Sequence, residues 1–486
     1  QTRFRQMAKA DCSICLNRTI SLLKEISYMY QIRFDRPVSV HFIGIGGISM
    51  SGLASVLLKE GFTVSGSDAS ETSLTRQLTE AGASICYGQR AENIREGIDV
   101  VVYTAAIHPD NPEFAAALEK NIPMLTRAEL LGQIMTNYET PVAVAGTHGK
   151  TTTTSMLSHV ELAAQLDPTI SVGGILPAIR GNIRVGSSGH FITEACEYTN
   201  SFLGFYPKIS IILNIDADHL DFFKDLNDIR HSFRLFAERT PAEGALVING
   251  TIPDLGDIIS GLPCRVITYG TPECDYYADH VTYDKNGCGS FDLFFHGENT
   301  GHFELMVPGE HNVSNATAVL AAAALLGIDT DTAGQGLKDF TGADRRFQKK
   351  GVIGGVTIID DYAHHPTEIE ATLKAAENYP HKNIWCVFQP HTYSRTQALM
   401  DDFARVLSRA DKIVLADIYA ARETDTLGIS SRTLLEKMQA LGADVHYFPS
   451  FHEIESFLLQ QCTDGDLLIT MGAGNVVEIG EHLLGS

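Results

Sequence analysis

The sequence lacks an apolar run long enough to cross a membrane. Its longest such stretch is AVLAAAALLGI at residues 318–328, whereas a membrane-spanning helix needs about 20 apolar residues. We therefore expect no membrane-embedded segment and interpret this stretch as a buried helix. Low-complexity tracts and internal repeats are also absent, and 44% hydrophobic with 20% charged residues is typical of a globular protein with a sizeable core.

Positive charge is also scarce. The chain has 37 Lys and Arg residues against 59 Asp and Glu residues, which gives a formal net charge of −22 at pH 7. This balance repels phosphate-rich surfaces and argues against nucleic acid or an anionic membrane as a partner. Small anionic substrates remain compatible with it, because local Lys and Arg side chains can override the global sign.

Paired cysteines are few. Among nine cysteines only Cys12 and Cys15 have CxxC spacing, and no second pair completes a zinc site. Free thiols in a reducing compartment follow from this pattern, and no secretion signal is recognisable, so we expect a cytoplasmic protein. Residues 1–28 precede the first clear strand and are expected to lie outside the fold.

Short apolar runs alternate with helical patterns along the rest of the chain. The order strand, helix, strand, helix, strand over residues 38–107 is typical of a parallel sheet covered by helices. Because new strand series begin later in the chain, we predict three α/β domains: a Rossmann-like domain over 29–138, a P-loop-type domain over 139–340 and a second Rossmann-like domain over 341–486. Such sheets bind ligands at the carboxyl ends of their strands.

The stretch VAVAGTHGKTTTT at residues 142–154 predicts a phosphate-binding loop between a strand and a helix. Glycines let backbone N–H groups face phosphate oxygens, and the start of the next helix adds partial positive charge. Lys150 can reach the β- and γ-phosphates, and the Thr151 hydroxyl can bind Mg²⁺. The usual GxxxxGK[ST] spacing would need glycine at Val144, so this loop begins at Gly146 instead. The alternative is a glycine turn capped by threonines.

Polar side chains follow other predicted strands of the first two domains. HFIGIGGISMSG at 41–52 ends a strand in a glycine turn, and Asp68 ends the next one. Alone these are compatible with a dinucleotide site, although Ser49 replaces the third glycine of GxGxxG. Glu194 and His219 follow two strands near the phosphate loop, where carboxylates favour Mg²⁺. His219 can equally be a solvated or capping histidine.

The third domain carries a further set of charged and aromatic residues. The pair Arg345–Arg346 opens it and can form a solvated hinge. A guanidinium can hold a carboxylate by two parallel hydrogen bonds. Candidate residues after two successive strands are Tyr362, His364, His391 and Arg395.

Together these stretches resemble the Mur ligase family, whose members share GTHGKTTT at their ATP site. The resemblance extends from about residue 29 to the C-terminus and is highly specific, because several stretches occur together. Those similar to the family are HFIGIGGISMSGLA at 41–54, SGSD at 65–68, NIDADHLD at 214–221, DDYAHHPTE at 360–368 and FQPHTYSRT at 388–396.

The resemblance implies the following site residues. ATP is expected at Gly146, Thr147, His148, Gly149, Lys150, Thr151, Thr152, Asn315, Arg345 and Arg346. Two Mg²⁺ ions are expected at Thr151, Glu194 and His219. A UDP-sugar is expected at Gly44, Gly46, Gly47, Ser51, Ser67 and Asp68. The amino acid and the transferred phosphate are expected at Tyr362, His364, His391 and Arg395, and the catalytic residues are Lys150, His219 and Arg395.

One feature of the family pattern is missing. Many members carry a carbamylated lysine some residues after the histidine, but the corresponding stretch HSFRLF at 231–236 has Arg234 and no lysine. A full ligand set for the second metal is therefore in question.

The activity that the resemblance implies is ATP-dependent amide-bond formation between L-alanine and the carboxylate of UDP-N-acetylmuramate, through an acyl phosphate, in peptidoglycan precursor synthesis. Both partners are small molecules, and a monomer or homodimer is expected. Three alternatives stay open: a family member that adds another amino acid or a tripeptide, a dinucleotide-dependent oxidoreductase, and a nucleotide-gated binding protein without ligase chemistry. The oxidoreductase leaves GTHGKTTT unexplained.

Overall fold

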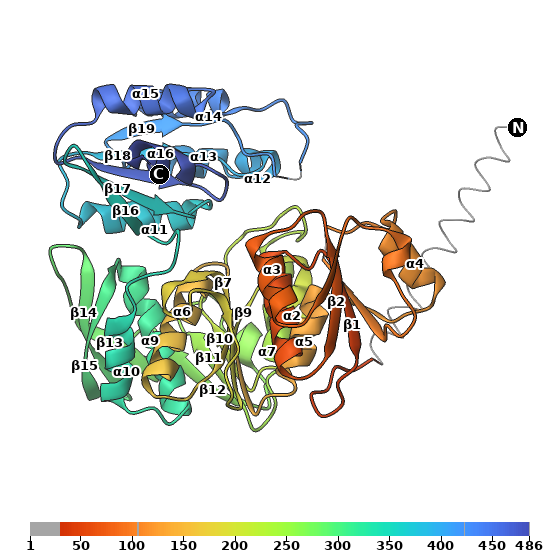
Figure 1. The fold of residues 1–486 in the computed structure, drawn as a ribbon. Coiled ribbons are helices and arrows are strands. Elements are labelled where there is room, and N and C mark those ends of the chain that lie inside the picture. The colour runs from red at the N-terminus through yellow and green to blue at the C-terminus, as the bar shows by residue number, and fades with distance from the viewer. Residues whose placement is uncertain (1–29, 105, 422, 486) are drawn as a thin grey trace, which may run out of the picture.

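The computed structural model describes residues 30–104, 106–421 and 423–485 (Figure 1). The expected N-terminal extension, residues 1–28, and the Cys12–Cys15 pair lie outside the described residues. Three sheets flanked by helices follow one another along the chain, which confirms the predicted fold class of three α/β domains. The domain boundaries themselves stay a prediction.

The N-terminal sheet has five parallel strands, in the spatial order β3 (Ser84–Tyr87), β2 (Thr63–Asp68), β1 (Ser39–Ile43), β4 (Val100–Tyr103) and β5 (Met124–Thr126). The order reverses between β1 and β4, and ligands of such sheets bind in the crevice at that point. Gly44 ends β1 with a φ of +82°, a conformation that favours glycine. The helices are α2 (Ile48–Lys59), α3 (Ser73–Glu80), η1 (Ala91–Asn93), α4 (Pro112–Glu119) and α5 (Arg127–Met135).

The middle sheet has ten strands, in the order β15 (Glu298–Pro308), β14 (Cys288–Phe295), β13 (Tyr276–Tyr283), β12 (Arg265–Tyr269), β11 (Ala245–Asn249), β10 (Ile209–Ile212), β6 (Thr140–Ala145), β9 (His190–Ala195), β7 (Thr169–Leu176) and β8 (Gly181–Arg184). Neighbours from β13 to β7 are parallel, which is typical of the α/β class predicted for this domain. The antiparallel strands β14, β15 and β8, which extend the sheet at both edges, were not predicted.

The helices of the middle domain are α6 (Lys150–Ala163), η2 (Pro177–Ile179), η3 (Tyr198–Gly204), α7 (Leu226–Ala237), α8 (Gly256–Ile259), α9 (Glu310–Leu325) and α10 (Thr330–Asp339). The apolar stretch 318–328 falls largely in α9 and is buried over residues 318–323, so the interpretation as a buried helix is confirmed. No helix in the described part of the chain is both long and apolar enough to cross a membrane.

The C-terminal sheet has six strands, in the order β16 (Gln348–Ile353), β17 (Val356–Asp361), β21 (Leu467–Met471), β18 (Ile384–Phe388), β19 (Lys412–Leu415) and β20 (Val445–Tyr447). Strand β16 is antiparallel to β17, and the other neighbours are parallel. Its helices are α11 (Pro366–Glu377), α12 (Tyr393–Ala398), α13 (Met400–Leu407), α14 (Ser431–Ala440), α15 (Phe451–Gln461) and α16 (Val477–Leu484).

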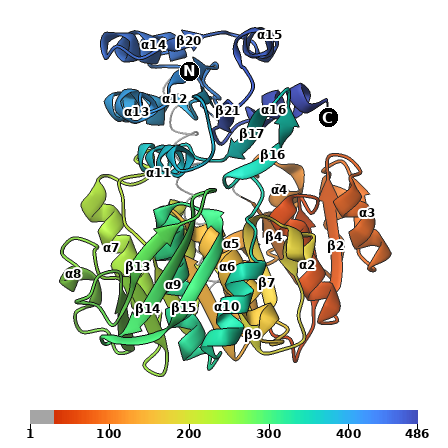
Figure 2. The same cartoon turned by 90° about the vertical axis from the view of Figure 1, so that its left-hand side faces the viewer.

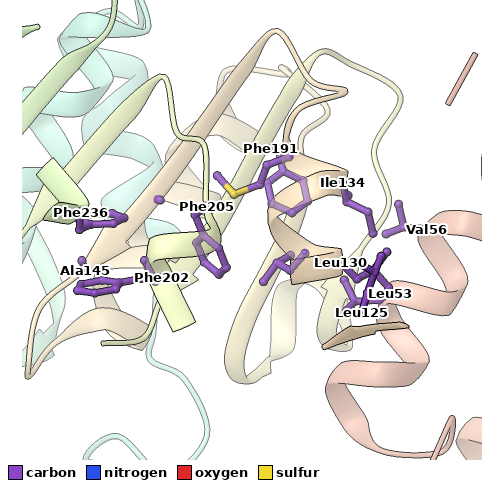
Figure 3. Close-up of a cluster of buried hydrophobic side chains, with 14 of the residues drawn as sticks. Leu53, Val56, Leu125, Leu130, Ile134, Ala145, Phe191, Phe202, Phe205 and Phe236 are labelled. Carbon is purple, nitrogen blue, oxygen red and sulfur yellow. The ribbon is translucent and has the colours of Figure 1, made fainter. Parts of the chain in front are cut away.

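One hydrophobic cluster spans the first two domains, whereas the clusters of the C-terminal domain stay within it. Leu53 and Val56 on α2 belong to the same buried cluster as Phe191, Phe202 and Phe236 of the middle domain (Figure 3). The clusters of the C-terminal domain contain only residues beyond 346. Figures 1 and 2 show this third domain above the middle one. Residues of both domains, among them Asp218 and Arg395, line one cavity, so this cavity lies between units with separate cores.

Candidate active site

The predicted phosphate loop lies at the carboxyl end of β6 and leads into α6. Gly149 caps this helix with a φ of +83°, which allows Lys150 to start the helix at once. The side chain of Asn214, after β10, holds the loop: its Oδ1 accepts from the backbone N–H of His148 at 2.8 Å, and its Nδ2 donates to the carbonyl of His148 at 3.1 Å. Sequence reasoning missed Asn214 because it singled out the acidic residues that follow.

The ammonium of Lys150 is held inside the loop. It donates to the carbonyl oxygens of Gly146 and Thr147 and to Oε2 of Glu197, the last at 3.0 Å. Burial would lower the pKa of Lys150, but the buried Glu197 carboxylate raises it overall. The lysine is therefore charged at neutral pH and places a positive charge inside the loop.

Thr151 and Glu194 meet around the Gly173–Gly174 pair of β7. An added Cβ at Gly173 would lie 2.7 Å from Oε2 of Glu194, and one at Gly174 would lie 3.3 Å from Cγ2 of Thr151. Hydroxyl and carboxylate oxygens are hard ligands that suit Mg²⁺, which keeps waters and phosphate oxygens in its remaining positions. Within the described ranges, no three His, Cys, Asp or Glu side chains come together as a metal site. Thr151 and Glu194 would therefore leave positions around a bound Mg²⁺ for waters and phosphate oxygens.

His219 stands apart from that pair. Its ring lies 4.5 Å from the ring of Tyr198, and its Nε2 is 3.9 Å from both Oε1 of Glu197 and Oδ2 of Asp218. Arg234 does not join this group, since its guanidinium donates to the carbonyls of residues 258 and 260 beside α8. The acids next to His219 are thus Glu197 and Asp218.

His148 links the phosphate loop to the C-terminal domain. Its Nε2 is 3.2 Å from Asp216 and its Nδ1 is 3.3 Å from Glu368, although neither contact has the alignment of a hydrogen bond. Burial alone would lower the pKa of His148, but the two carboxylates raise it to about 9. The imidazolium is therefore an electrostatic bridge between domains at neutral pH.

Arg395 and Asp218 form a second bridge across the same cleft. Nε and Nη2 of Arg395 donate to Oδ1 of Asp218 at 3.1 and 2.9 Å, and Nη1 contacts Nδ1 of His391 at 3.2 Å. Burial lowers the pKa of both His364 and His391 to about 4, so both imidazoles are neutral. A cavity of about 520 Å³ opens beside them, lined by residues that include His219, His391 and Arg395.

The two arginines that open the third domain have different environments. Arg345 donates to Oδ2 of Asp360 at 2.9 Å and to the carbonyls of Gly472 and Gly474, so its guanidinium is committed within the C-terminal domain. Nη2 of Arg346 instead lies 3.5 Å from Oγ1 of Thr151 in the phosphate loop. Tyr362 lies beneath both guanidinium groups, at 4.9 and 5.4 Å from ring centroid to Cζ. The geometry thus directs Arg346, not Arg345, toward the loop.

Asn315 lies against the other side of the phosphate loop. An added Cβ at Gly149 would come within 2.9 Å of its Oδ1. Asn315 also lines a second cavity of about 480 Å³, between the middle domain and α11, together with Tyr269 and Thr367. Thr147, by contrast, faces Asp216, whose N–H it accepts at 2.9 Å, and the half-buried Thr152 lies within α6.

In the N-terminal domain several expected ligand groups are engaged by the protein. Asp68 accepts the backbone N–H of Gly46 at 2.7 Å and so closes the glycine turn, in which Gly47 caps α2. The Ser67 hydroxyl, fully buried, donates to Glu113, and the Ser51 hydroxyl donates to a carbonyl within α2. The first N–H groups of α2 have no partner within that helix and can receive an anion.

These features define a three-domain α/β protein whose phosphate loop faces a cleft closed by the third domain. Three family models match consecutive parts of the chain: "Mur ligase family, catalytic domain" over residues 39–139, "Mur ligase middle domain" over 144–323 and "Mur ligase, glutamate ligase domain" over 345–474. The chain belongs to the Mur ligase family, whose enzymes are ATP-dependent ligases.

Relatives agree with this assignment over nearly their whole length. The UDP-N-acetylmuramate–L-alanine ligases of Agathobacter rectalis and Lachnospira eligens are 63% and 57% identical to this chain, with 94% of this chain and 100% of each relative covered. The crystal structure of the UDP-N-acetylmuramate–alanine ligase of Thermotoga maritima is similar with a TM-score of 0.76 and 28% identity, covering 92% of this chain and 98% of that one.

Proposed function

We propose that this chain joins L-alanine to the carboxylate of UDP-N-acetylmuramate through an acyl phosphate, with conversion of ATP to ADP and phosphate, in peptidoglycan precursor synthesis in the cytoplasm. The observation that carries the proposal is the phosphate loop, where Lys150 is linked through Glu197 to His219 at the edge of the interdomain cavity. Relatives with that activity in their names support the same pair of substrates. We expect the chain to carry out this reaction as a monomer or a homodimer.

The chemistry follows from the weakness of a carboxylate as an acyl donor. Transfer of the γ-phosphoryl group to the carboxylate converts a poor leaving group, oxide, into phosphate. The amine of L-alanine then attacks the acyl carbon, the C–N bond forms as the C–O bond to phosphate breaks, and the amine loses a proton. Lys150 neutralises charge that develops on the moving phosphoryl group. Mg²⁺ bound by Thr151 and Glu194 would add positive charge there.

Each domain has a part in this scheme. The backbone of Gly146–Thr152 holds the phosphates of ATP, Asn315 holds its base, and Arg346 reaches the loop from the third domain. The glycine turn at Gly44–Gly47, closed by Asp68, receives the UDP-sugar. His219 is the proposed ligand of a second Mg²⁺ ion.

The amino acid is placed in the cavity beside Arg395, with Tyr362, His364 and His391. Neutral imidazoles suit this place, because an imidazolium would repel the ammonium of L-alanine. Closure of the C-terminal domain excludes water, which would otherwise hydrolyse the acyl phosphate.

The test is a coupled assay of the purified chain. With UDP-N-acetylmuramate, ATP and Mg²⁺, phosphate release should require L-alanine, and mass analysis should show the amide product. Equal release without any amino acid would reject the ligase. L-serine, glycine and a tripeptide, offered in place of L-alanine, decide between this substrate and those of sister ligases, and a titration with NAD(P)H decides the oxidoreductase alternative.

A further inference from the structure

Arg127 is a half-buried guanidinium that makes no hydrogen bond or ion pair with any other residue in the described part of the chain. The arginines of the third domain differ, since Arg345 and Arg395 each pair with a carboxylate. Burial lowers the pKa of Arg127, and only the thiol of Cys196, among the described side chains, opposes this shift. Removing a cation from water without a counter-ion is unfavourable, so an anion bound from outside would be stabilised at this position.

Arg127 lies where the N-terminal sheet binds its ligands. It is the first residue of α5, directly after β5, and Thr126 before it pairs with Tyr103 at the carboxyl end of β4. Strand β4 borders the crevice at which the strand order reverses. Arg127 therefore shares the carboxyl edge of this sheet with the glycine turn that begins at Gly44.

The residues so far assigned to the UDP-sugar include no cation. They comprise glycines, two serines engaged by the protein, and Asp68, which is itself negative. A sugar nucleotide carries a pyrophosphate, and UDP-N-acetylmuramate carries a carboxylate as well. Backbone N–H groups alone would have to balance these charges, whereas a guanidinium matches either oxyanion with two parallel hydrogen bonds.

The helix that Arg127 begins packs against the middle domain. Cys196, the neighbour of Arg127, follows β9 between Glu194 and Glu197, close to the ammonium of Lys150. Helix α5 is fixed against the segment after Cys196, because an added Cβ at Gly132 would lie 1.9 Å from the carbonyl oxygen of Gly204. Arg127 is thus held between the carboxyl edge of the first sheet and the phosphate loop.

We propose that Arg127 binds an oxyanion of the sugar nucleotide, either its pyrophosphate or its carboxylate; this inference rests on the proposed function. Binding breaks no ion pair within the described ranges, since the guanidinium forms none there. The same absence makes the residue dispensable for folding. A structural arginine and a ligand-binding arginine therefore predict opposite effects on the free protein.

The test compares Arg127→Gln with Arg95→Gln, which removes the same charge from an exposed position of the same domain. Among the residues that the structure describes, the Arg95 guanidinium forms a hydrogen bond only with the thiol of Cys86, at 3.9 Å. Titrations with UDP-N-acetylmuramate should show about 10- to 100-fold weaker binding for Arg127→Gln, as expected for a charge-assisted hydrogen-bond pair, and no change for Arg95→Gln. Arg127→Lys, which keeps the charge but loses the paired geometry, should fall between.

UDP-N-acetylglucosamine, which lacks the carboxylate, distinguishes the two oxyanions. An equal loss for both nucleotides assigns Arg127 to the pyrophosphate, and a loss confined to UDP-N-acetylmuramate assigns it to the carboxylate. Unchanged affinity for both nucleotides overturns the proposal.

Thermal unfolding separates binding from structure. The ligand-free Arg127→Gln variant should unfold at the wild-type temperature or above it, while the added stabilisation by UDP-N-acetylmuramate shrinks. A lower midpoint without ligand would mean a structural role and overturn the proposal. If the wild-type protein neither binds UDP-N-acetylmuramate nor forms product, the proposed function itself is rejected. If the wild type does both and Arg127→Gln binds the nucleotide equally well, only the role of Arg127 is rejected.

Discussion

Replacing Lys150 by methionine separates the two roles of this lysine, in catalysis and in the stability of the phosphate loop. The ammonium is 3.0 Å from Oε2 of Glu197, whose side chain is only 2% exposed. Removing one partner leaves the other charge buried without compensation, which costs about 3–5 kcal/mol. Since 15% of the Lys150 side chain is exposed, we expect the lower end of that range.

A loss of about 3 kcal/mol should lower the unfolding midpoint by about 6–12 °C, given about 2–4 °C per kcal/mol for a domain of this size. Glu197→Gln should lower the free energy of unfolding by a similar amount, because it leaves the Lys150 ammonium buried without its carboxylate. The double variant should recover most of the loss, since both buried charges are then gone. Its ligase activity should stay absent, because no cation is left at the γ-phosphoryl group.

Thermal unfolding of the wild type, both single variants and the double variant measures the coupling, and L-alanine-dependent phosphate release measures catalysis. If the losses of unfolding free energy in the two single variants add up to the loss in the double variant within about 0.5 kcal/mol, the two side chains do not interact. The account of the loop would then be wrong. Wild-type turnover by Lys150→Met would remove this lysine from the mechanism.

Three further predictions concern contacts at the phosphate loop and between the domains. The pKa of His148 in the folded protein, about 9, lies above its unfolded value. Its contribution to stability is therefore complete below about pH 6.5 and is lost as the pH rises through 9. His148→Gln should flatten this part of a plot of unfolding midpoint against pH. Gly132→Ala should lower the unfolding midpoint by overpacking against a backbone carbonyl, whereas Gly334→Ala, whose added Cβ meets its nearest atom at 3.6 Å, should not. Arg346→Gln should raise the KM for ATP and leave the unfolding midpoint unchanged. Arg345→Gln should lower the unfolding midpoint, because it leaves the buried carboxylate of Asp360 without its guanidinium. Equal behaviour of the two variants would contradict their different contacts.

Much of the architecture was predictable because it depends on short-range patterns. Alternation of apolar strands with helical segments indicated three α/β domains, and the glycines at 44 and 149 mark turns whose positive φ favours glycine. The antiparallel strands β14 and β15 escaped prediction, because their exposed face breaks the apolar runs by which the parallel strands were found. The phosphate loop was located for a local reason, since its backbone geometry depends on consecutive residues.

The partners of the polar side chains could not be read from the sequence in the same way. Arg395 and Asp218 are 177 residues apart, and Glu368 reaches His148 only because the C-terminal domain folds back over the loop. A carboxylate after a strand has the same local pattern whether it receives a lysine, a histidine or a metal ion. Which of these it meets depends on how separately folded units pack, because charge interactions act through space and not along the chain.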